Sequence, residues 1–175
     1  MKTKDLTAAA LFAALTAVCS QLAIPTPWDV PINLATMAVF LAAGTLGWKW
    51  ATVSQVIFLA LGAVGVPVFA GFRGGLACLV GPTGGYLIGY VAAALLTGLL
   101  IEALPRRTAA MPVAMACGLA VCYALGTVMY AAVTATPFLS ALFLCVVPYL
   151  PGDAVKIAVA TLICARVRTA LPRTA

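Results

Sequence analysis

The sequence has 175 residues, of which 65% are hydrophobic and only 8% are charged. Soluble domains are nearer half apolar and a quarter charged, so this composition indicates a protein that lies in the lipid bilayer. The formal charge is +6, but the basic residues stand at the ends of long apolar runs. This arrangement is typical of membrane topology, predicts contact with membrane lipids and argues against a nucleic-acid-binding surface.

Several kinds of chemistry are excluded by what the sequence lacks. It contains no histidine, which removes the usual haem and zinc ligands and any Ser-His or Cys-His catalytic pair. The six cysteines form no Cys-x-x-Cys pair and mostly lie in apolar segments, so we interpret them as packing residues. No nucleotide-binding P-loop occurs. We therefore predict no catalytic site, no metal site and no cofactor.

Six apolar segments are long enough to be membrane-spanning helices, since crossing a bilayer takes about 20 residues and shorter spans are tolerated. The first segment lacks a clear cleavage site, so we interpret it as a retained helix and not as a signal peptide. The predicted helices cover about residues 5–24, 32–46, 49–64, 84–103, 110–133 and 153–167. The expected fold class is an all-α membrane protein, with residues 1–175 in a single six-helix transmembrane domain.

Glycine and proline mark the connections between these helices. Pro25 and Pro27 end the first helix, and the short turn at residues 47–49 predicts that the second and third helices are antiparallel neighbours. The segments 25–31, 65–82 and 134–152 are too irregular to face lipid, so we predict structured loops, the last with a short helix near residues 139–146.

The distribution of lysine and arginine predicts how the chain is oriented. Threading the helices through the bilayer puts only Arg73 on one side. The other side collects Lys2, Lys4, Lys49, Arg106, Arg107, Arg166, Arg168 and Arg173. We therefore predict a multi-pass protein of the cell membrane with both termini cytoplasmic. The three structured loops then share the outer face, where they could cap a cavity.

Two charges do not fit this topological pattern. Asp153 and Lys156 begin the last apolar segment and, three residues apart on a helix, share a face. Charged groups at membrane depth usually face a cavity or a partner. They could pair with each other or reach the outer interface, or they could bind a polar ligand through a carboxylate acceptor and an ammonium donor.

A second candidate region is the glycine-rich loop and the helix start that follows it. Phe69 and Phe72 could close over an apolar ring, while Arg73 could face a ligand or anchor the loop to lipid headgroups. Gly84 could admit a ligand against the helix backbone or serve only for helix packing. The hydroxyl groups available to a ligand in this region belong to Thr83, Tyr86 and Tyr90.

The first helix carries a stripe of small residues, which allow close helix contacts in lipid. The stripe consists of Ala9, Ala13 and Ala17, with Ala10 and Ala14 beside it. It could pack inside the chain's own bundle or dock a second membrane protein, and its composition does not separate the two.

Three motifs together resemble the BioY family, the biotin-specific S components of energy-coupling factor (ECF) transporters. They are Pro67-Val68-Phe69 with Gly71-Phe72 and Gly74-Gly75, then Gly81-Pro82-Thr83-Gly84-Gly85-Tyr86, and finally Pro148-Tyr149-Leu150-Pro151-Gly152-Asp153 with Lys156. The resemblance covers nearly the whole chain and implies a six-helix substrate-binding domain with structured extracellular loops. It also implies biotin as the ligand, and partnership with a transmembrane coupling protein and two cytoplasmic ATPase subunits.

The resemblance assigns roles to the candidate residues. It implies that Asp153 and Lys156 contact the ligand, that the segment from Gly81 to Tyr86 lines the pocket, and that the alanine stripe is the docking face. The chemistry of biotin fits, because Asp153 could accept from the ureido N–H groups while Lys156 bonds the ureido carbonyl or the carboxylate. The rings of Phe69, Phe72, Tyr86 and Tyr149 would enclose the apolar part.

Two other hypotheses remain. The chain could be a membrane structural or assembly protein whose Asp153 and Lys156 form an internal pair without a ligand. It could also be an intramembrane enzyme that uses the same two residues and tyrosines as acid and base, although few such groups are present. We expect a binding protein that is not an enzyme.

Overall fold

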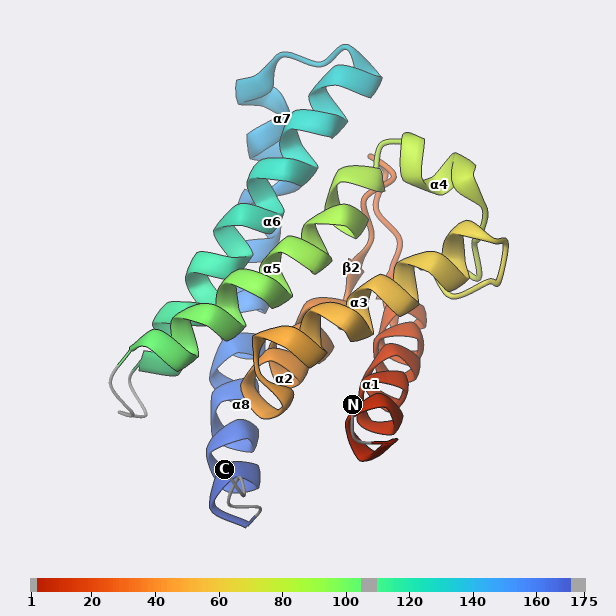
Figure 1. The fold of residues 1–175 in the computed structure, drawn as a ribbon. Helices are drawn as coiled ribbons and strands as arrows, with labels where there is room; N and C mark the ends of the chain where they lie inside the picture. Colours follow the sequence, from red (N-terminus) through yellow and green to blue (C-terminus); the bar gives the residue numbers. More distant parts are fainter. Residues whose placement is uncertain (1–2, 105–109, 171–175) are drawn as a thin grey trace.

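The computed structural model describes residues 3–104 and 110–170, which form a bundle of helices and one pair of two-residue strands. The elements are α1 (Thr3–Gln21), β1 (Ala23–Ile24), β2 (Ile32–Asn33), α2 (Ala35–Leu46), α3 (Trp48–Ala63), α4 (Leu76–Val80), α5 (Gly84–Ala103), α6 (Ala110–Thr134), α7 (Phe138–Cys145), the 3-10 turn η1 (Val147–Tyr149) and α8 (Leu150–Ala170). Figure 1 shows the start of α1 and the end of α8 at one end of the bundle and the short helices α4 and α7 at the other.

The six predicted helices are confirmed as α1, α2, α3, α5, α6 and α8, and the predicted short helix is α7. Within the described residues, α5, α6 and the segment Phe138–Thr169 are long and apolar enough to cross a membrane, and α2 is a shorter apolar helix. Helix α4 and the strand pair were not predicted. Four basic residues of the orientation argument lie outside the described part of the chain, namely Lys2, Arg106, Arg107 and Arg173.

The first helix ends at Gln21, earlier than the predicted residue 24, because the chain turns into a small antiparallel pair. Ala23 pairs with Asn33, and Ile24 pairs with Ile32. The backbone N–H of Leu34 then donates to the carbonyl of Cys19 at 3.3 Å. The loop over residues 25–31 is therefore held against the end of α1, and it delivers the chain directly into α2.

The last helix begins at Leu150, three residues before the predicted start at Asp153. Pro151 does not prevent this, because the N–H groups of a first helical turn have no partner inside the helix. The earlier start leaves Asp153 in the first turn, where a negative charge interacts favourably with the helix dipole. Lys156 follows one turn later on the same face, as the spacing predicted.

Helices α5 and α6 approach each other closely where both carry glycine. A Cβ atom added at Gly85 would lie 2.7 Å from the Cβ of Met129 and 3.0 Å from the Cα of Gly126. A Cβ at Gly84 would meet the backbone of Leu79 and, at 2.9 Å, the Cε of Met129. The glycines at the start of α5 thus serve helix packing, the alternative that the sequence left open.

We expect Gly85→Ala to destabilise the folded protein by about 1 to 3 kcal/mol, because a methyl group there forces α5 away from α6. Thermal unfolding in detergent should show this as a lowered Tm. Gly152→Ala is the matched control, since a Cβ at Gly152 would meet nothing within 4 Å. Equal Tm values for the two variants would contradict the close α5–α6 contact.

Candidate functional site

A cavity of about 310 Å³ lies among the end of α1, the loop 25–31, the residues after α3 and the starts of α5 and α8. This volume is at the lower end of the range for small-molecule sites, which is about 300 to 1,000 Å³. Eight of the predicted ligand-binding residues line it: Phe69, Arg73, Thr83, Tyr86, Tyr90, Tyr149, Asp153 and Lys156. The fold therefore brings together most of the candidates from three separate stretches of sequence.

The two charged residues near the start of the last helix, Asp153 and Lys156, are buried and paired at the cavity wall. Asp153 is 2% exposed and Lys156 is 8% exposed. The ammonium Nζ of Lys156 lies 2.7 Å from Oδ1 of Asp153. The pair thus shows the mutual contact that a structural role requires, and both residues also line the cavity.

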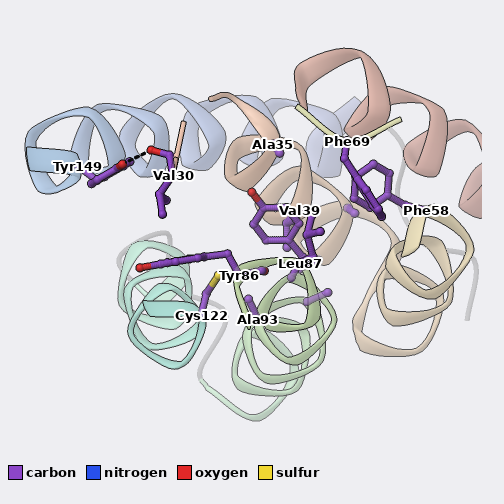
Figure 2. Close-up of a cluster of buried hydrophobic side chains, with 14 of the residues drawn as sticks. Val30, Ala35, Val39, Phe58, Phe69, Tyr86, Leu87, Ala93, Cys122 and Tyr149 are labelled. Atoms are coloured by element: carbon purple, nitrogen blue, oxygen red, sulfur yellow. Dashed lines mark hydrogen bonds between the residues drawn. The ribbon is translucent and has the colours of Figure 1, made fainter. Parts of the chain in front are cut away.

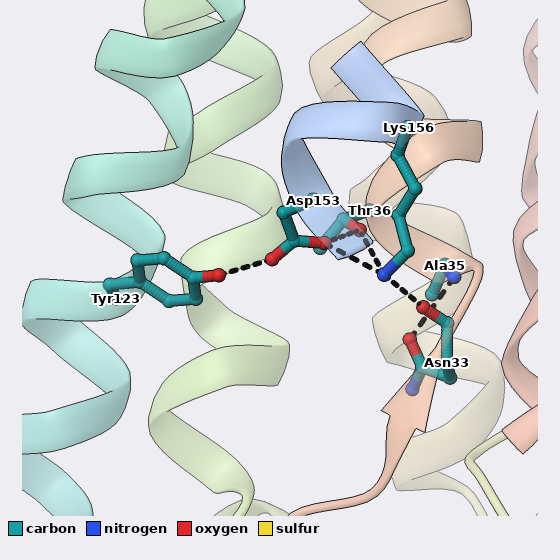
Figure 3. Close-up of polar contacts among 6 residues, drawn as sticks. All are labelled: Asn33, Ala35, Thr36, Tyr123, Asp153 and Lys156. Carbon is teal, nitrogen blue, oxygen red and sulfur yellow. Dashed lines mark hydrogen bonds and ion pairs between the residues drawn. The ribbon is translucent and has the colours of Figure 1, made fainter. Parts of the chain in front are cut away.

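Neighbouring elements supply further hydrogen bonds to this pair, as Figure 3 shows. The Nζ of Lys156 donates to the carbonyl of Asn33 at 2.5 Å and lies 3.4 Å from Oγ1 of Thr36. The Thr36 hydroxyl is also 3.3 Å from Oδ1 of Asp153, and the Tyr123 hydroxyl donates to Oδ2 of Asp153. Residues of β2, α2 and α6 therefore hold the side chains of Asp153 and Lys156 in one orientation.

The position of Asn33 follows from the local structure. Its side-chain Oδ1 accepts from the backbone N–H of Ala35 at 3.1 Å, which satisfies a free donor at the start of α2. Its backbone carbonyl is left to accept from Lys156. The strand pair between β1 and β2 fixes this residue at the point where the chain enters α2, so the small sheet positions part of the site.

Sequence reasoning missed the residues that complete this polar cluster. Asn33, Thr36 and Tyr123 all line the cavity. Asn33 and Thr36 are uncharged polar residues near the start of α2, and Tyr123 is one of two tyrosines within the long uncharged run of α6. The available signal was a polar side chain inside a predicted membrane span. By itself this signal does not indicate whether that side chain faces the cavity or another helix.

Aromatic side chains form the apolar part of the wall. Phe69 is buried and packs edge to face on Phe58 of α3, with ring centroids 5.5 Å apart. Figure 2 shows this pair, and it shows Tyr86 of α5 beside Cys122 of α6. The Tyr86 hydroxyl lies 3.4 Å from the carbonyl of Cys145, so its ring is presented to the cavity while its polar end is bound by protein.

Tyr149 joins two of the segments around the cavity. Its hydroxyl donates to the carbonyl of Val30 and accepts from Nε1 of Trp28, the latter at 2.9 Å. The bond to Val30 is visible in Figure 2. Because Trp28 and Val30 belong to the loop after β1, this tyrosine ties that loop to the turn before α8.

Two predicted site residues do not line the cavity. Gly84 packs closely against Leu79 and Met129 and is not part of the cavity wall. Phe72 is 74% exposed and lies at the tip of a tight hairpin, with its ring outside the cavity. The hairpin turns between Phe69 and Arg73, so these two residues reach the wall and Phe72 does not.

The alanine stripe of α1 is split between the interior and the surface. Ala9 and Ala13 are 0% and 2% exposed and pack within the chain, which is the packing role that the sequence left open for the stripe. Ala17 is half-buried. Ala10 and Ala14 are exposed, because they lie one position further around the helix. Of the five alanines, Ala10 and Ala14 offer the most exposed surface to a partner.

Comparison with known proteins gives consistent relatives over almost the full length. A profile of the BioY family matches residues 1–173. The biotin transporter BioY of Rhodobacter capsulatus is 39% identical, with 91% of this chain and 90% of the relative aligned. The probable biotin transporter BioY of Pyrococcus horikoshii is also 39% identical, with 96% and 98% aligned.

A solved structure shows the same arrangement of helices. It is a crystal structure of the S-component for biotin from an ECF-type ABC transporter, and it matches this fold with a TM-score of 0.89 at 30% sequence identity. The match covers 97% of this chain and 95% of that chain. With a family profile spanning the sequence, relatives at 39% identity and this common fold, the chain belongs to the BioY family.

Proposed function

We propose that this chain is the biotin-binding membrane subunit, or S component, of an ECF-type ABC transporter, and that it captures the vitamin for uptake driven by partner ATPases. Its relatives are biotin transporters, and the similar solved structure is an S component for biotin. The observation that carries the proposal is the buried Asp153–Lys156 pair at the wall of an aromatic-lined cavity. Such a pair offers both an acceptor and a donor to a polar guest.

The hydrogen bonds already present leave capacity for a ligand. A carboxylate has about four lone-pair positions. The carboxylate of Asp153 accepts three hydrogen bonds. Lys156 and Thr36 donate to Oδ1, and Tyr123 donates to Oδ2. We infer that Oδ2 accepts one further N–H, which the ureido ring of biotin provides. The 3.4 Å contact between Lys156 and Thr36 is the weakest of the lysine's bonds, and a ligand oxygen can replace it.

The apolar part of biotin suits the remaining wall. The rings of Phe69, Tyr86, Tyr90 and Tyr149 all border the same space. The Tyr86 and Tyr149 hydroxyls bond carbonyl groups of the protein, so their ring faces can contact the thioether ring without leaving a buried polar group unpaired. Arg73, exposed at the cavity border, adds a second positive charge for an anionic ligand.

The proposed orientation puts the cavity end of the bundle outside the cell and both termini in the cytoplasm. Figure 1 supports this, because the start of α1 and the end of α8 share the end opposite α4 and α7. Among the described residues, Lys4, Lys49, Arg166 and Arg168 belong to helix ends remote from the cavity, whereas Arg73 borders it. This asymmetry follows the positive-inside rule.

The proposed partners are a transmembrane coupling protein and two cytoplasmic ATPase subunits. The absence of a P-loop in the sequence is consistent with energy supplied by other chains. Ala10 and Ala14, with the exposed Leu11 and Val18, form a surface of α1 on which small residues permit close helix contact. We propose this surface as the docking face for the coupling protein.

We expect purified, folded protein in nanodiscs to bind labelled biotin at equilibrium. Unlabelled biotin should displace the label, whereas thiamine and riboflavin at the same concentration should not, because neither carries a cyclic urea with two N–H donors and a carboxylate tail. A folded sample that binds no biotin would rule out the proposed function.

Exchange of both charges, as Asp153→Asn with Lys156→Gln, should weaken biotin binding by about 1 to 3 kcal/mol, because the polar groups of the ligand lose their charged partners. That loss corresponds to an increase in Kd of about 5-fold to 150-fold. The double exchange avoids the unpaired buried charge that either single change creates. An unchanged Kd would favour an internal pair with a purely structural role.

The docking face can be tested by comparing two neighbouring alanines. Ala10→Trp on the exposed face should reduce co-purification with the coupling protein while biotin binding is retained. Ala13→Trp, at a buried position, should instead lower the Tm, because the ring has no space inside the bundle. If Ala10→Trp leaves co-purification intact, the partner docks elsewhere.

A further inference from the structure

Gln21, the last residue of α1, binds three backbone groups of the segment after α3. Its Nε2 donates to the carbonyl of Pro67 at 3.3 Å and to the carbonyl of Phe69 at 3.0 Å. Its Oε1 accepts from the backbone N–H of Phe72 at 2.9 Å. One side chain thus connects α1 to a segment about 50 residues away in sequence.

The bound segment is a tight hairpin with an unfavourable backbone conformation. Phe69 and Arg73 exchange two backbone hydrogen bonds, at 3.0 and 3.2 Å. Between them, Gly71 has φ of 73° and Phe72 has φ of 56°. Glycine adopts a positive φ readily, but a bulky residue such as phenylalanine does so only where its surroundings impose it. The bond from Phe72 N–H to Gln21 is the contact that holds this residue.

The hairpin matters because its residues form one wall of the cavity. Phe69, Ala70, Gly71 and Arg73 all line it, as does Gln21 itself. Phe69 is buried against Phe58, and Arg73 brings its positive charge to the cavity border. A change in the hairpin conformation would therefore move both an aromatic ring and a cation away from a ligand.

We propose that Gln21 is a positioning residue for the ligand, and that it holds the 69–73 hairpin in the conformation that presents Phe69 and Arg73 to the cavity. This inference rests on the proposed function, since biotin is the ligand used to test it. Glutamine suits the role because its amide supplies two donors and an acceptor. A glutamate would set a carboxylate against the Pro67 and Phe69 carbonyls, and an asparagine is one methylene shorter.

The test measures biotin Kd and ligand-free Tm for wild type, Gln21→Ala, Gln21→Glu and the double variant Gln21→Ala/Phe72→Asn. We expect Gln21→Ala to raise Kd about tenfold, because the hairpin loses the three neutral hydrogen bonds that hold it, with little change in Tm. Gln21→Glu should raise it further. Asparagine tolerates positive φ, so Phe72→Asn should recover part of the affinity lost in Gln21→Ala.

Leu22→Ala is the matched control, because Leu22 is an exposed apolar residue next to Gln21 that does not line the cavity, and its Kd should equal that of wild type. If wild type binds biotin and Gln21→Ala binds equally well, the inference is wrong while the proposed function stands. A Tm loss like that of Gly85→Ala, without recovery by Phe72→Asn, would show a merely structural role and overturn it. Gln21→Asn replaces Gln21→Ala if the latter does not fold.

Discussion

The structure depends on keeping an aspartate and a lysine buried within a bundle of membrane helices. A charge at the centre of a bilayer costs about 2.5 to 3.5 kcal/mol on insertion scales, so each must find partners. Asp153 and Lys156 find them in each other and in Asn33, Thr36 and Tyr123. These partners come from a strand and two other helices, so the pair can be satisfied only when the whole end of the bundle is assembled.

The irregular segments at that end are arranged around the same requirement. The strand pair puts the Asn33 carbonyl in reach of Lys156, Tyr149 ties the loop 25–31 to the turn before α8, and Gln21 holds the hairpin that carries Phe69. Close glycine contacts between α5 and α6 give these segments a rigid support. The result is a partly open cavity whose wall combines aromatic rings with the charged cluster, Arg73 and other polar side chains, among them Asp29.

The sequence predicted the six long helices because apolar runs and their proline and glycine boundaries are local signals. It also indicated that Asp153 and Lys156 share a face, since the three-residue spacing fixes this. It did not predict Tyr123 or Thr36, because their role depends on which helix face meets α8. For the same reason the sequence could not tell that Ala13 is buried and Ala14 is exposed, since only the packing of α1 against its neighbours decides this. The exclusion of Phe72 from the cavity follows from a hairpin turn that no local pattern specified.

The most direct test of this account is an experimental structure of the protein with biotin. We predict that biotin occupies the cavity of about 310 Å³, with a polar group of the ligand within hydrogen-bond distance of Asp153 or Lys156. Biotin bound at another place, with Asp153 and Lys156 contacting only protein groups and no ligand in the cavity, would contradict it.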